Sequence, residues 1–173
     1  MLAFTLGLCL AQEVSPANHS QPTPKTISAQ PSPTSLEDSA AEGTLLELAN
    51  QSRQQAGAPP LRENKNLSEA AHTHARLMVT KQQLSHQFDG ESSLMTRFTE
   101  VGLRIDRAGE NVAYNASAEK AFAALMQSPP HRRNLLDPNF NTAGFAAFWS
   151  NGRLYVVQDF AHQLANFVSP SAK

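Results

Sequence analysis

The region that follows residue 36 begins with apolar residues three or four positions apart, which is the period of amphipathic helices. This pattern predicts a first helix over residues 39–56, with Leu45 and Leu48 on its inner face and Gly57 as its C-cap. A second helix is predicted to begin at Asn66, which forms a capping box with the glutamate three positions later. The first part of the domain is therefore expected to be helical.

The second predicted helix has a stripe of inward-facing residues that includes Leu67, Ala71, His74 and Met78. Because His74 lies on this stripe, we expect a packed, hydrogen-bonded histidine rather than a ligand. His72 lies off the stripe and is expected at the surface. The sequence thus separates two histidines that are only two positions apart.

Two further helices are predicted, at residues 92–101, where Gly102 ends the helix, and at residues 118–127, where Ser117 is the N-cap. Residues 109–115, which lie between these helices, contain few apolar positions, and we expect a loop or a short extended piece there. The connection between the helices is therefore predicted to carry polar side chains on an irregular or extended backbone.

The last third of the chain changes to a period of two. Residues 142–149 and 154–160 alternate around the turn sequence Ser-Asn-Gly at 150–152, which predicts an antiparallel hairpin. Phe148 and Trp149 are then expected on opposite sides of the sheet. Helices before a small antiparallel sheet give the α+β class.

The N-terminal residues have a composition unlike that of the domain. Residues 1–11 are apolar and resemble a secretory signal peptide, which predicts a protein of the extracellular space or the cell envelope. Residues 12–36 are rich in Pro, Ser, Thr and Gln and are expected to form a disordered linker. The domain itself is predicted at residues 37–162, followed by a flexible tail at residues 163–173.

Charge and cysteine content exclude several classes of function. The formal net charge of -1 and the sequence pI of about 6.6 provide no basic field for nucleic acid. The single cysteine, Cys9, lies in the apolar segment at residues 1–11, so the mature domain is expected to lack disulfides, cysteine zinc ligands and cysteine nucleophiles. We expect no transmembrane segment and a monomer.

The sequence Ser-Pro-Pro-His at positions 128–131 predicts a further short helix that ends at Asp137. Ser128 is its predicted N-cap and His131 its third residue, where the helix dipole and the neighbouring arginines keep the imidazole neutral. Arg53 and Asn134 lie near element ends, like Asp137, and surface or capping roles are expected for these three residues.

Three motifs occur in a fixed order: Ser-His at His86, Gly-Glu-Asn at Glu110, and Ser-Pro-Pro-His-Arg-Arg-Asn-Leu-Leu around His131. In this order the chain resembles the CAP (SCP) superfamily, particularly its secreted single-domain bacterial branch, over residues 42–162. The resemblance implies a three-layer α-β-α sandwich with a small antiparallel sheet between helices.

The resemblance also implies that His86, Glu110 and His131 face a shared groove, with Ser128 and Asn111 at its rim. The family's second acidic residue is expected near residues 125–128, where this chain has no acidic side chain. Two imidazoles and one carboxylate remain, a ligand set that zinc or another divalent metal accepts. The alternative is a structural role in which Glu110 hydrogen-bonds His131 or a backbone amide.

Three functions follow from this groove. The first is a secreted CAP-domain module that binds a small ligand, a lipid or a divalent metal ion without catalysis. The second is a zinc-dependent hydrolase in which Glu110 is a third ligand or the general base. The third is an extracellular or cell-wall interaction protein that uses its outer helices. The chain has no His-Glu-x-x-His, Gly-x-Ser-x-Gly or phosphate-loop motif, which favours the non-catalytic functions.

Overall fold

The structure is a computed structural model that describes residues 36–165. The predicted signal peptide at residues 1–11, nearly all of the predicted linker, and residues 166–173 of the predicted tail lie outside the described residues. Within the described part, no helix combines the length and the apolar character that are needed to cross a membrane.

The described residues form five helices and five strands. In chain order these elements are β1 (Leu36–Glu37), α1 (Ser39–Gln55), β2 (Arg62–Glu63), α2 (Lys65–Lys81), α3 (Leu94–Glu100), β3 (Ile105–Asn115), α4 (Ala118–Gln127), α5 (Pro129–Leu136), β4 (Thr142–Ser150) and β5 (Arg153–Gln163). The predicted α+β class is therefore confirmed.

The strands form one sheet in the order β1-β4-β5-β3. The pairs β4–β5, β3–β5 and β1–β4 are antiparallel, whereas the two-residue strand β2 runs parallel to β4. The predicted hairpin is formed by β4 and β5, and β3 pairs with β5 along almost its whole length. This topology places β3 at an edge of the sheet, where loops and α5 can approach its side chains.

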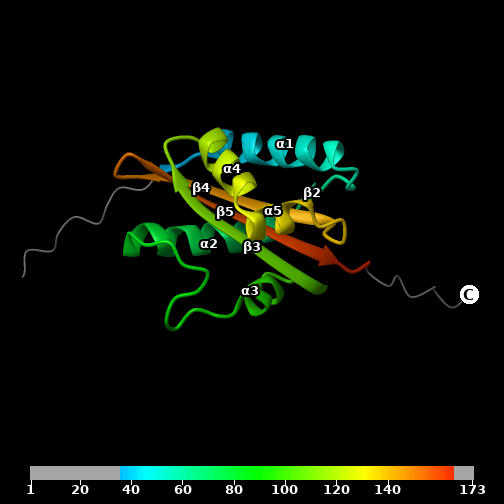
Figure 1. The fold of residues 1–173 in the computed structure, drawn as a ribbon. Helices are drawn as coiled ribbons and strands as arrows, with labels where there is room; N and C mark the ends of the chain where they lie inside the picture. The colour runs from blue at the N-terminus through cyan, green and yellow to red at the C-terminus, as the bar shows by residue number, and fades with distance from the viewer. Residues whose placement is uncertain (1–35, 166–173) are drawn as a thin grey trace, which may run out of the picture. The chain divides into compact units, whose positions relative to one another are not determined.

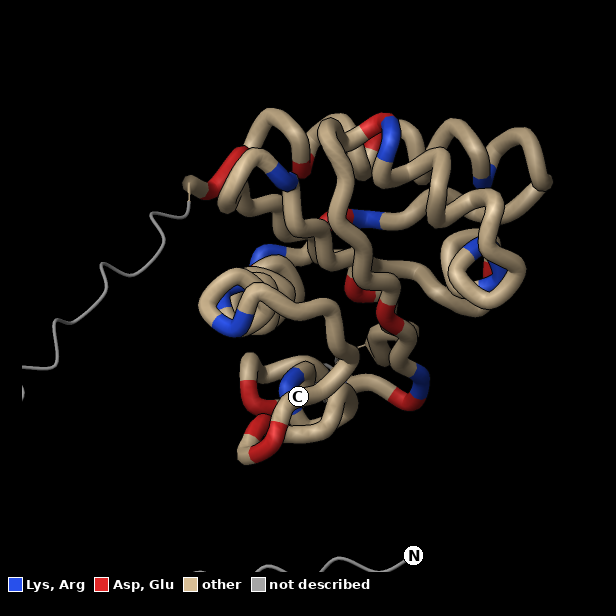
Figure 2. The backbone as a smooth tube through the Cα atoms, turned by 60° about the vertical axis from the view of Figure 1, so that its left-hand side comes forward, with Lys and Arg blue, Asp and Glu red and all other residues tan. Residues whose placement is uncertain are grey.

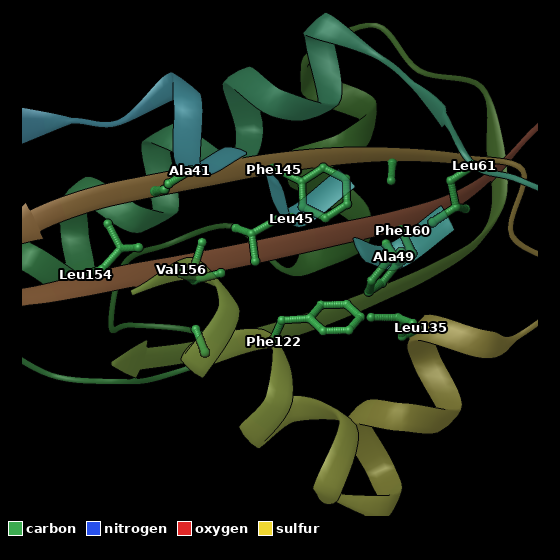
Figure 3. Packing of buried hydrophobic residues seen from close by; sticks show 14 of the residues in the cluster. Ala41, Leu45, Ala49, Leu61, Phe122, Leu135, Phe145, Leu154, Val156 and Phe160 are labelled. Atoms are coloured by element: carbon green, nitrogen blue, oxygen red, sulfur yellow. The ribbon is translucent and has the colours of Figure 1, made fainter. Parts of the chain in front are cut away.

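Helices cover both faces of the sheet, as Figure 1 shows, with α1, α4 and α5 on one face and α2 and α3 on the other. The predicted three-layer sandwich is confirmed. The largest apolar cluster lies under α1 and α4, where Leu45, Phe122 and Leu135 pack against Phe145 and Phe160 of the sheet (Figure 3). Burial of these side chains provides the main favourable free energy of folding.

The face under α2 depends on a close approach between helix and strand. A Cβ atom added to Gly144 of β4 would lie 2.3 Å from the backbone carbonyl carbon of Leu67 and from the backbone nitrogen of Ser68. Only glycine therefore allows α2 to rest directly on β4. This contact fixes the helix that carries His72 and His74.

Several predicted elements have the expected bounds. The helix predicted at residues 118–127 is α4, and the Ser117 side chain accepts the expected capping hydrogen bond from the backbone nitrogen of Lys120. Phe148 and Trp149 pack in different clusters on opposite faces of the sheet, as the alternation predicted. Strong local periodicity and clear caps explain this agreement.

Other boundaries differ from the prediction. Residues 109–115, for which a loop or a short extended piece was predicted, are extended and form the C-terminal part of β3, which begins four residues earlier. Strand β5 continues to Gln163, where a tail was predicted to begin. Helix α2 begins at Lys65 because the side chain of Asn64, and not that of Asn66, caps it. Ser128 is the N-cap residue of α5, but its side chain makes no capping hydrogen bond.

Figure 2 shows Lys and Arg positions interspersed with Asp and Glu positions along the described backbone, in keeping with the formal net charge of -1. A mixed surface of this kind gives no long-range attraction for a polyanion. The charges that distinguish this fold are instead the buried ones, which are Arg53 at the end of α1 and a group that includes Arg97, Glu110 and Asp159 around β3.

Candidate functional site

Glu110 of the edge strand β3 is the centre of a buried charged network. Its side chain is only 2 % exposed, and both carboxylate oxygens have partners. Oε1 lies 2.8 Å from Nδ1 of His86, and Oε2 lies 2.7 Å from Nη2 of Arg97. The structure therefore brings two of the three predicted site residues, His86 and Glu110, into direct contact.

The partners of Glu110 come from the α2/α3 side of the sheet. His86 lies in the loop between α2 and α3 and keeps 60 % of its side chain exposed, whereas Arg97 of α3 is buried. Arg97 also lies 3.6 Å from Glu91, which pairs with His74 of α2 at 2.6 Å. The network thus joins α2, α3 and their connecting loop to β3.

His74 has the role that the helical stripe predicted. Its ring is fully buried, with Nδ1 against Glu91 and Nε2 2.8 Å from the backbone oxygen of Ser85. Nε2 also lies 3.8 Å from Glu110. Because both ring nitrogens are occupied, His74 supports the loop that carries His86 and is not available to a ligand.

The electrostatics of the pair follow from these contacts. Burial alone would raise the pKa of Glu110, but the hydrogen bond with His86 and the positive charge of Arg97 lower it below its ordinary value. The hydrogen bond with Glu110 in turn raises the pKa of His86, against the effect of burial. Since an ionised carboxylate only accepts, Nδ1 of His86 is the donor and Nε2 is left for another partner.

Asp159 is a second carboxyl group beside Glu110, because the register of β3 and β5 pairs the two residues. It is fully buried, and neither of its oxygens has a hydrogen-bond partner among the described residues. Burial, together with the negative charge of Glu110, raises the pKa of Asp159 well above its ordinary value. The protein therefore favours the neutral form of this acid.

His131 is the third residue of α5, as predicted, and α5 lies on the face of the sheet opposite to the α2/α3 side that carries His86. Its backbone oxygen accepts a hydrogen bond of 3.1 Å from the side chain of Asn111. Burial and the positive charge of His86 lower the pKa of the His131 imidazole, which therefore stays neutral at pH 7. Within the described residues no hydrogen bond joins this ring to Glu110, which bonds His86 and Arg97 instead.

Asn111 holds α5 against the sheet. Its side chain is fully buried, donates to Gln158 on β5 at 3.1 Å and accepts from Asn134 of α5 at 3.0 Å. Asn111 was expected at the groove rim but forms a buried support behind His131. Asn134 also donates to the backbone oxygen of Glu110 at 3.1 Å, so its role is to connect α5 with β3 rather than to cap.

Two further expectations about polar side chains need correction. Arg53 was expected at the surface or in a cap. It is fully buried, so the surface position is wrong, but it donates to the backbone oxygens of Leu135 and Asp137 at the end of α5, which is a capping role, and also to those of Pro59 and Phe140. His72 was expected at the surface, but its side chain is only 13 % exposed and pairs with Glu42 of α1. In both cases the side chain is buried because it pairs with groups that are distant in sequence.

A metal ion requires several ligand atoms close together. Among the described residues, the ligand atoms of Glu37, Glu42 and His72 lie within 4.8 Å of one another, and no other such group of three occurs. His86, Glu110 and His131 do not form one. In this geometry Glu110 contacts His86 as a hydrogen-bond partner rather than as a fellow ligand.

A separate groove runs along α4 and α5. It has a volume of about 700 Å³ and combines apolar with basic residues. Its lining consists of Met126, Gln127, Pro129, Arg132, Arg133, Leu136, Asp137 and Pro138. This groove contains none of His86, Glu110 and His131, so the described surface has two separate candidate regions.

Comparisons with known proteins agree with this architecture. The model of the cysteine-rich secretory protein family, CAP, matches residues 46–160. The uncharacterized protein YkwD of Bacillus subtilis is 32 % identical over 135 residues, which are 78 % of this chain and 51 % of YkwD. This chain thus spans about half the length of that relative.

Solved structures share the fold. An extracellular protein containing an SCP domain from Bacillus anthracis superposes with a TM-score of 0.65 at 23 % identity, covering 72 % of this chain and 41 % of that one. An outer surface protein from Borrelia burgdorferi superposes with a TM-score of 0.71 at 15 % identity, covering 76 % of this chain and 99 % of that one. At these identities the likeness concerns the fold alone.

Proposed function

Because this chain belongs to the CAP family, we propose that it is an extracellular binding module in which His86 and His131 hold a divalent metal ion, with zinc as the best match. The supporting observation is the contact of 2.8 Å between His86 Nδ1 and the carboxylate of Glu110. A metal-binding histidine typically donates its other ring N–H to a carboxylate, which fixes the tautomer and directs Nε2 to the metal. Glu110 would therefore orient a ligand rather than act as one.

The state of His131 supports the same function. Burial and the charge of His86 lower its pKa, so at pH 7 the ring has a lone pair for a metal ion. Two imidazoles leave coordination positions for water or for a small external ligand. A bound ion would supply Lewis acidity at these positions.

This geometry does not favour the zinc-dependent hydrolase. A general base needs a carboxylate oxygen that can take a proton from water, whereas both oxygens of Glu110 already have charged or hydrogen-bonding partners. Ser128 occupies the region where the family's second acidic residue is expected. A binding module requires no general base, so neither the hydrogen bonds of Glu110 nor the absence of the second acidic residue counts against it.

The extracellular location is part of the proposal. Its support is the apolar segment at residues 1–11, together with two structural neighbours that are described as an extracellular protein and an outer surface protein. Detection of the protein in the culture supernatant or the cell-envelope fraction of its source would test the location.

The metal site can be tested by zinc uptake of the full chain after dialysis at pH 7.5. The double variant His86→Ala, His131→Ala should bind one zinc ion fewer than the wild type. His162→Ala, which removes another partly exposed histidine, is the matched control and should bind as the wild type does. Glu110→Gln should weaken binding by about 10- to 100-fold, as expected for a residue that orients a ligand. Equal uptake by the wild type and the double variant would exclude the site.

The groove between α4 and α5 suggests a second candidate ligand, an anionic amphiphile such as a fatty acid. Its volume of about 700 Å³ suits a small molecule, and Met126 and Leu136 offer apolar contacts. Arg132 and Arg133 are exposed at the same groove and would pair with a carboxylate head group.

Displacement of a fluorescent fatty acid measures this second activity. The double variant Arg132→Gln, Arg133→Gln should bind the probe at least about tenfold more weakly, since two charge-assisted contacts are lost. The double variant Arg62→Gln, Arg104→Gln, at two exposed positions outside the groove lining, is the control for net charge. Equal weakening by the control would show that the probe responds to charge alone.

A further inference from the structure

A group of three side chains outside the proposed His86–His131 metal site also has the composition of a metal site. Glu37 of β1, Glu42 of α1 and His72 of α2 each offer one ligand atom, and these atoms all lie within 4.8 Å of one another. We infer that this group, the Glu37–Glu42–His72 cluster, is a second site for a divalent cation of the zinc type. The cluster is independent of the proposed His86–His131 site because it includes none of His86, Glu110 and His131.

The distances within the cluster suit a zinc ion. Nε2 of His72 lies 2.9 Å from Oε1 of Glu42 and 4.0 Å from Oε1 of Glu37. Ligand atoms at about 2.0 to 2.1 Å from a tetrahedral zinc lie roughly 3.4 Å from one another. The observed separations lie on either side of this value, so small side-chain movements would admit an ion. One imidazole and two carboxylates leave a fourth position for water.

Besides the contact between His72 and Glu42, each of the three residues also has a partner outside the cluster. Glu42 Oε1 accepts a hydrogen bond of 3.0 Å from the backbone nitrogen of Ala147 in β4. The ring of His72 packs edge-on against Phe148, with ring centroids 5.7 Å apart, and Glu37 is paired with Phe148 in the sheet. The cluster is therefore built on two residues of β4, and an ion there would tie β1 to both α1 and α2.

The surrounding charge favours a cation. Glu69 Oε2 lies 4.0 Å from Nδ1 of His72, which brings a third carboxylate to the cluster. Within residues 36–165 the one cation paired with these acids is Arg76, whose guanidinium contacts Oε2 of Glu37 at 3.6 Å and Oε1 of Glu69 at 3.8 Å. Oε1 of Glu37, the atom that faces His72, is the one left for an ion. With neutral His72 the three carboxylates outnumber this single cation.

A proton competes with the ion for His72. The hydrogen bond with Glu42 raises the pKa of His72 against the effect of burial, with smaller contributions from the charges of Glu42 and Glu37, which raise it, and of Arg76, which lowers it. Metal binding needs neutral imidazole, so an ion would replace this proton between His72 and Glu42. The site should therefore bind zinc more tightly as the pH rises from 6 to 8.

The experiment uses zinc alone as the probe and the full-length chain that already carries His86→Ala and His131→Ala. This background removes the proposed His86–His131 site, so that failure of one proposal does not decide the other. We expect one zinc ion per chain in this background, a melting temperature that rises with zinc, and tighter binding at pH 8 than at pH 6. Adding His72→Gln should abolish both the uptake and the zinc-dependent shift.

A second variant protects the test against misfolding of His72→Gln. Glu37 is 43 % exposed, so Glu37→Gln should leave the fold intact while it removes one ligand. It should weaken zinc binding by at least about tenfold, whereas the exposed control Glu100→Gln should not. The inference is overturned if the background binds no zinc, or if neither Glu37→Gln nor His72→Gln changes its uptake.

Discussion

Two buried arginines, one on each face of the sheet, find different partners for a guanidinium that has no access to water. Arg53 of α1 is fully buried and directs its guanidinium at neutral backbone oxygens between 2.7 and 2.9 Å away. Arg97 of α3 instead faces two carboxylates, those of Glu110 and Glu91. Its Nε and Nη1 atoms have no hydrogen-bond partner in the described chain.

This difference distinguishes Arg53, whose role is structural, from Arg97, which belongs to the candidate functional site. The guanidinium of Arg53 joins the end of α1 to the segment after α5, and its geometry leaves each contacted carbonyl satisfied. The network around Arg97 contains incompletely bonded polar atoms next to the exposed ring of His86. Such incompletely satisfied buried groups cost free energy and are characteristic of functional sites rather than of stability.

The largest effect is expected for Arg53. Arg53→Met leaves several buried carbonyl oxygens without donors and should lower the free energy of unfolding by about 3 to 5 kcal/mol. Urea unfolding measures this change. The control Arg104→Met, at an exposed position, should stay within about 0.5 kcal/mol of the wild type. A loss below about 1 kcal/mol for Arg53→Met would contradict the structural role of Arg53.

The fold could be predicted where local pattern and tertiary packing agree. Helix α4 and the β4–β5 hairpin have strong periodicity, an N-cap or a turn sequence, and both were predicted almost to their ends. The full length of β3 was not predicted, because Glu110 and Asn111, which point to opposite faces, are both polar and both buried. Their partners lie on α3, α5 and β5, so the local pattern left open a loop or a short extended piece where the structure has a long edge strand.

The candidate site was predicted only in part, because here too the partners of the motif residues are distant in sequence. The motif order identified His86, Glu110 and His131, but no motif contained Arg97. The closing sequence Tyr-Val-Val-Gln-Asp-Phe at 155–160, which also belongs to the family resemblance, contains Asp159 but gave that residue no role. Helical spacing did contain a signal, since Arg97 lies three positions after Leu94 and precedes Phe98 on the buried stripe of α3. Likewise, Asp159 alternates with Phe160 along β5 and must face the α2/α3 side. A charged residue on an apolar stripe is the pattern that reveals such networks.

A smaller effect is expected when Arg97 loses its charge. Arg97→Met should lower the free energy of unfolding at pH 7 by about 1 to 3 kcal/mol, less than Arg53→Met, because two of its nitrogens have no bond to lose. The loss should shrink toward pH 4. The ion pair contributes stability above the ordinary pKa of Glu110, 4.5, and this contribution is lost as the pH falls through the lowered pKa.

Urea unfolding at pH 7 and pH 4, with a chelator present, tests this prediction. Arg53→Met is the comparison variant, since its carbonyl partners do not titrate and its loss should be similar at both pH values. If Arg97→Met lost the same free energy at both, the interaction with Glu110 would not be the source of its effect.

The smallest effect concerns Asp159, where the sign of the pH dependence is reversed. Burial and the charge of Glu110 raise the pKa of Asp159 in the folded protein, so folding favours its protonated form above the ordinary value of 3.8. The contribution of this group to stability therefore decreases as the pH rises above that value. Asp159→Asn imitates the neutral acid and should match the wild type at pH 4 but exceed its free energy of unfolding at pH 8.

Urea midpoints at pH 4, 6 and 8 measure this divergence, and Asp89→Asn, at an exposed position, should follow the wild type throughout. Parallel curves for Asp159→Asn and the wild type would mean that Asp159 is ionised in the folded protein. Arg97 would then have to balance two negative charges beside Glu91, with only one short contact to a carboxylate. A neutral Asp159 removes that conflict, because it leaves the single charge of Glu110 for Arg97 and His86 to share.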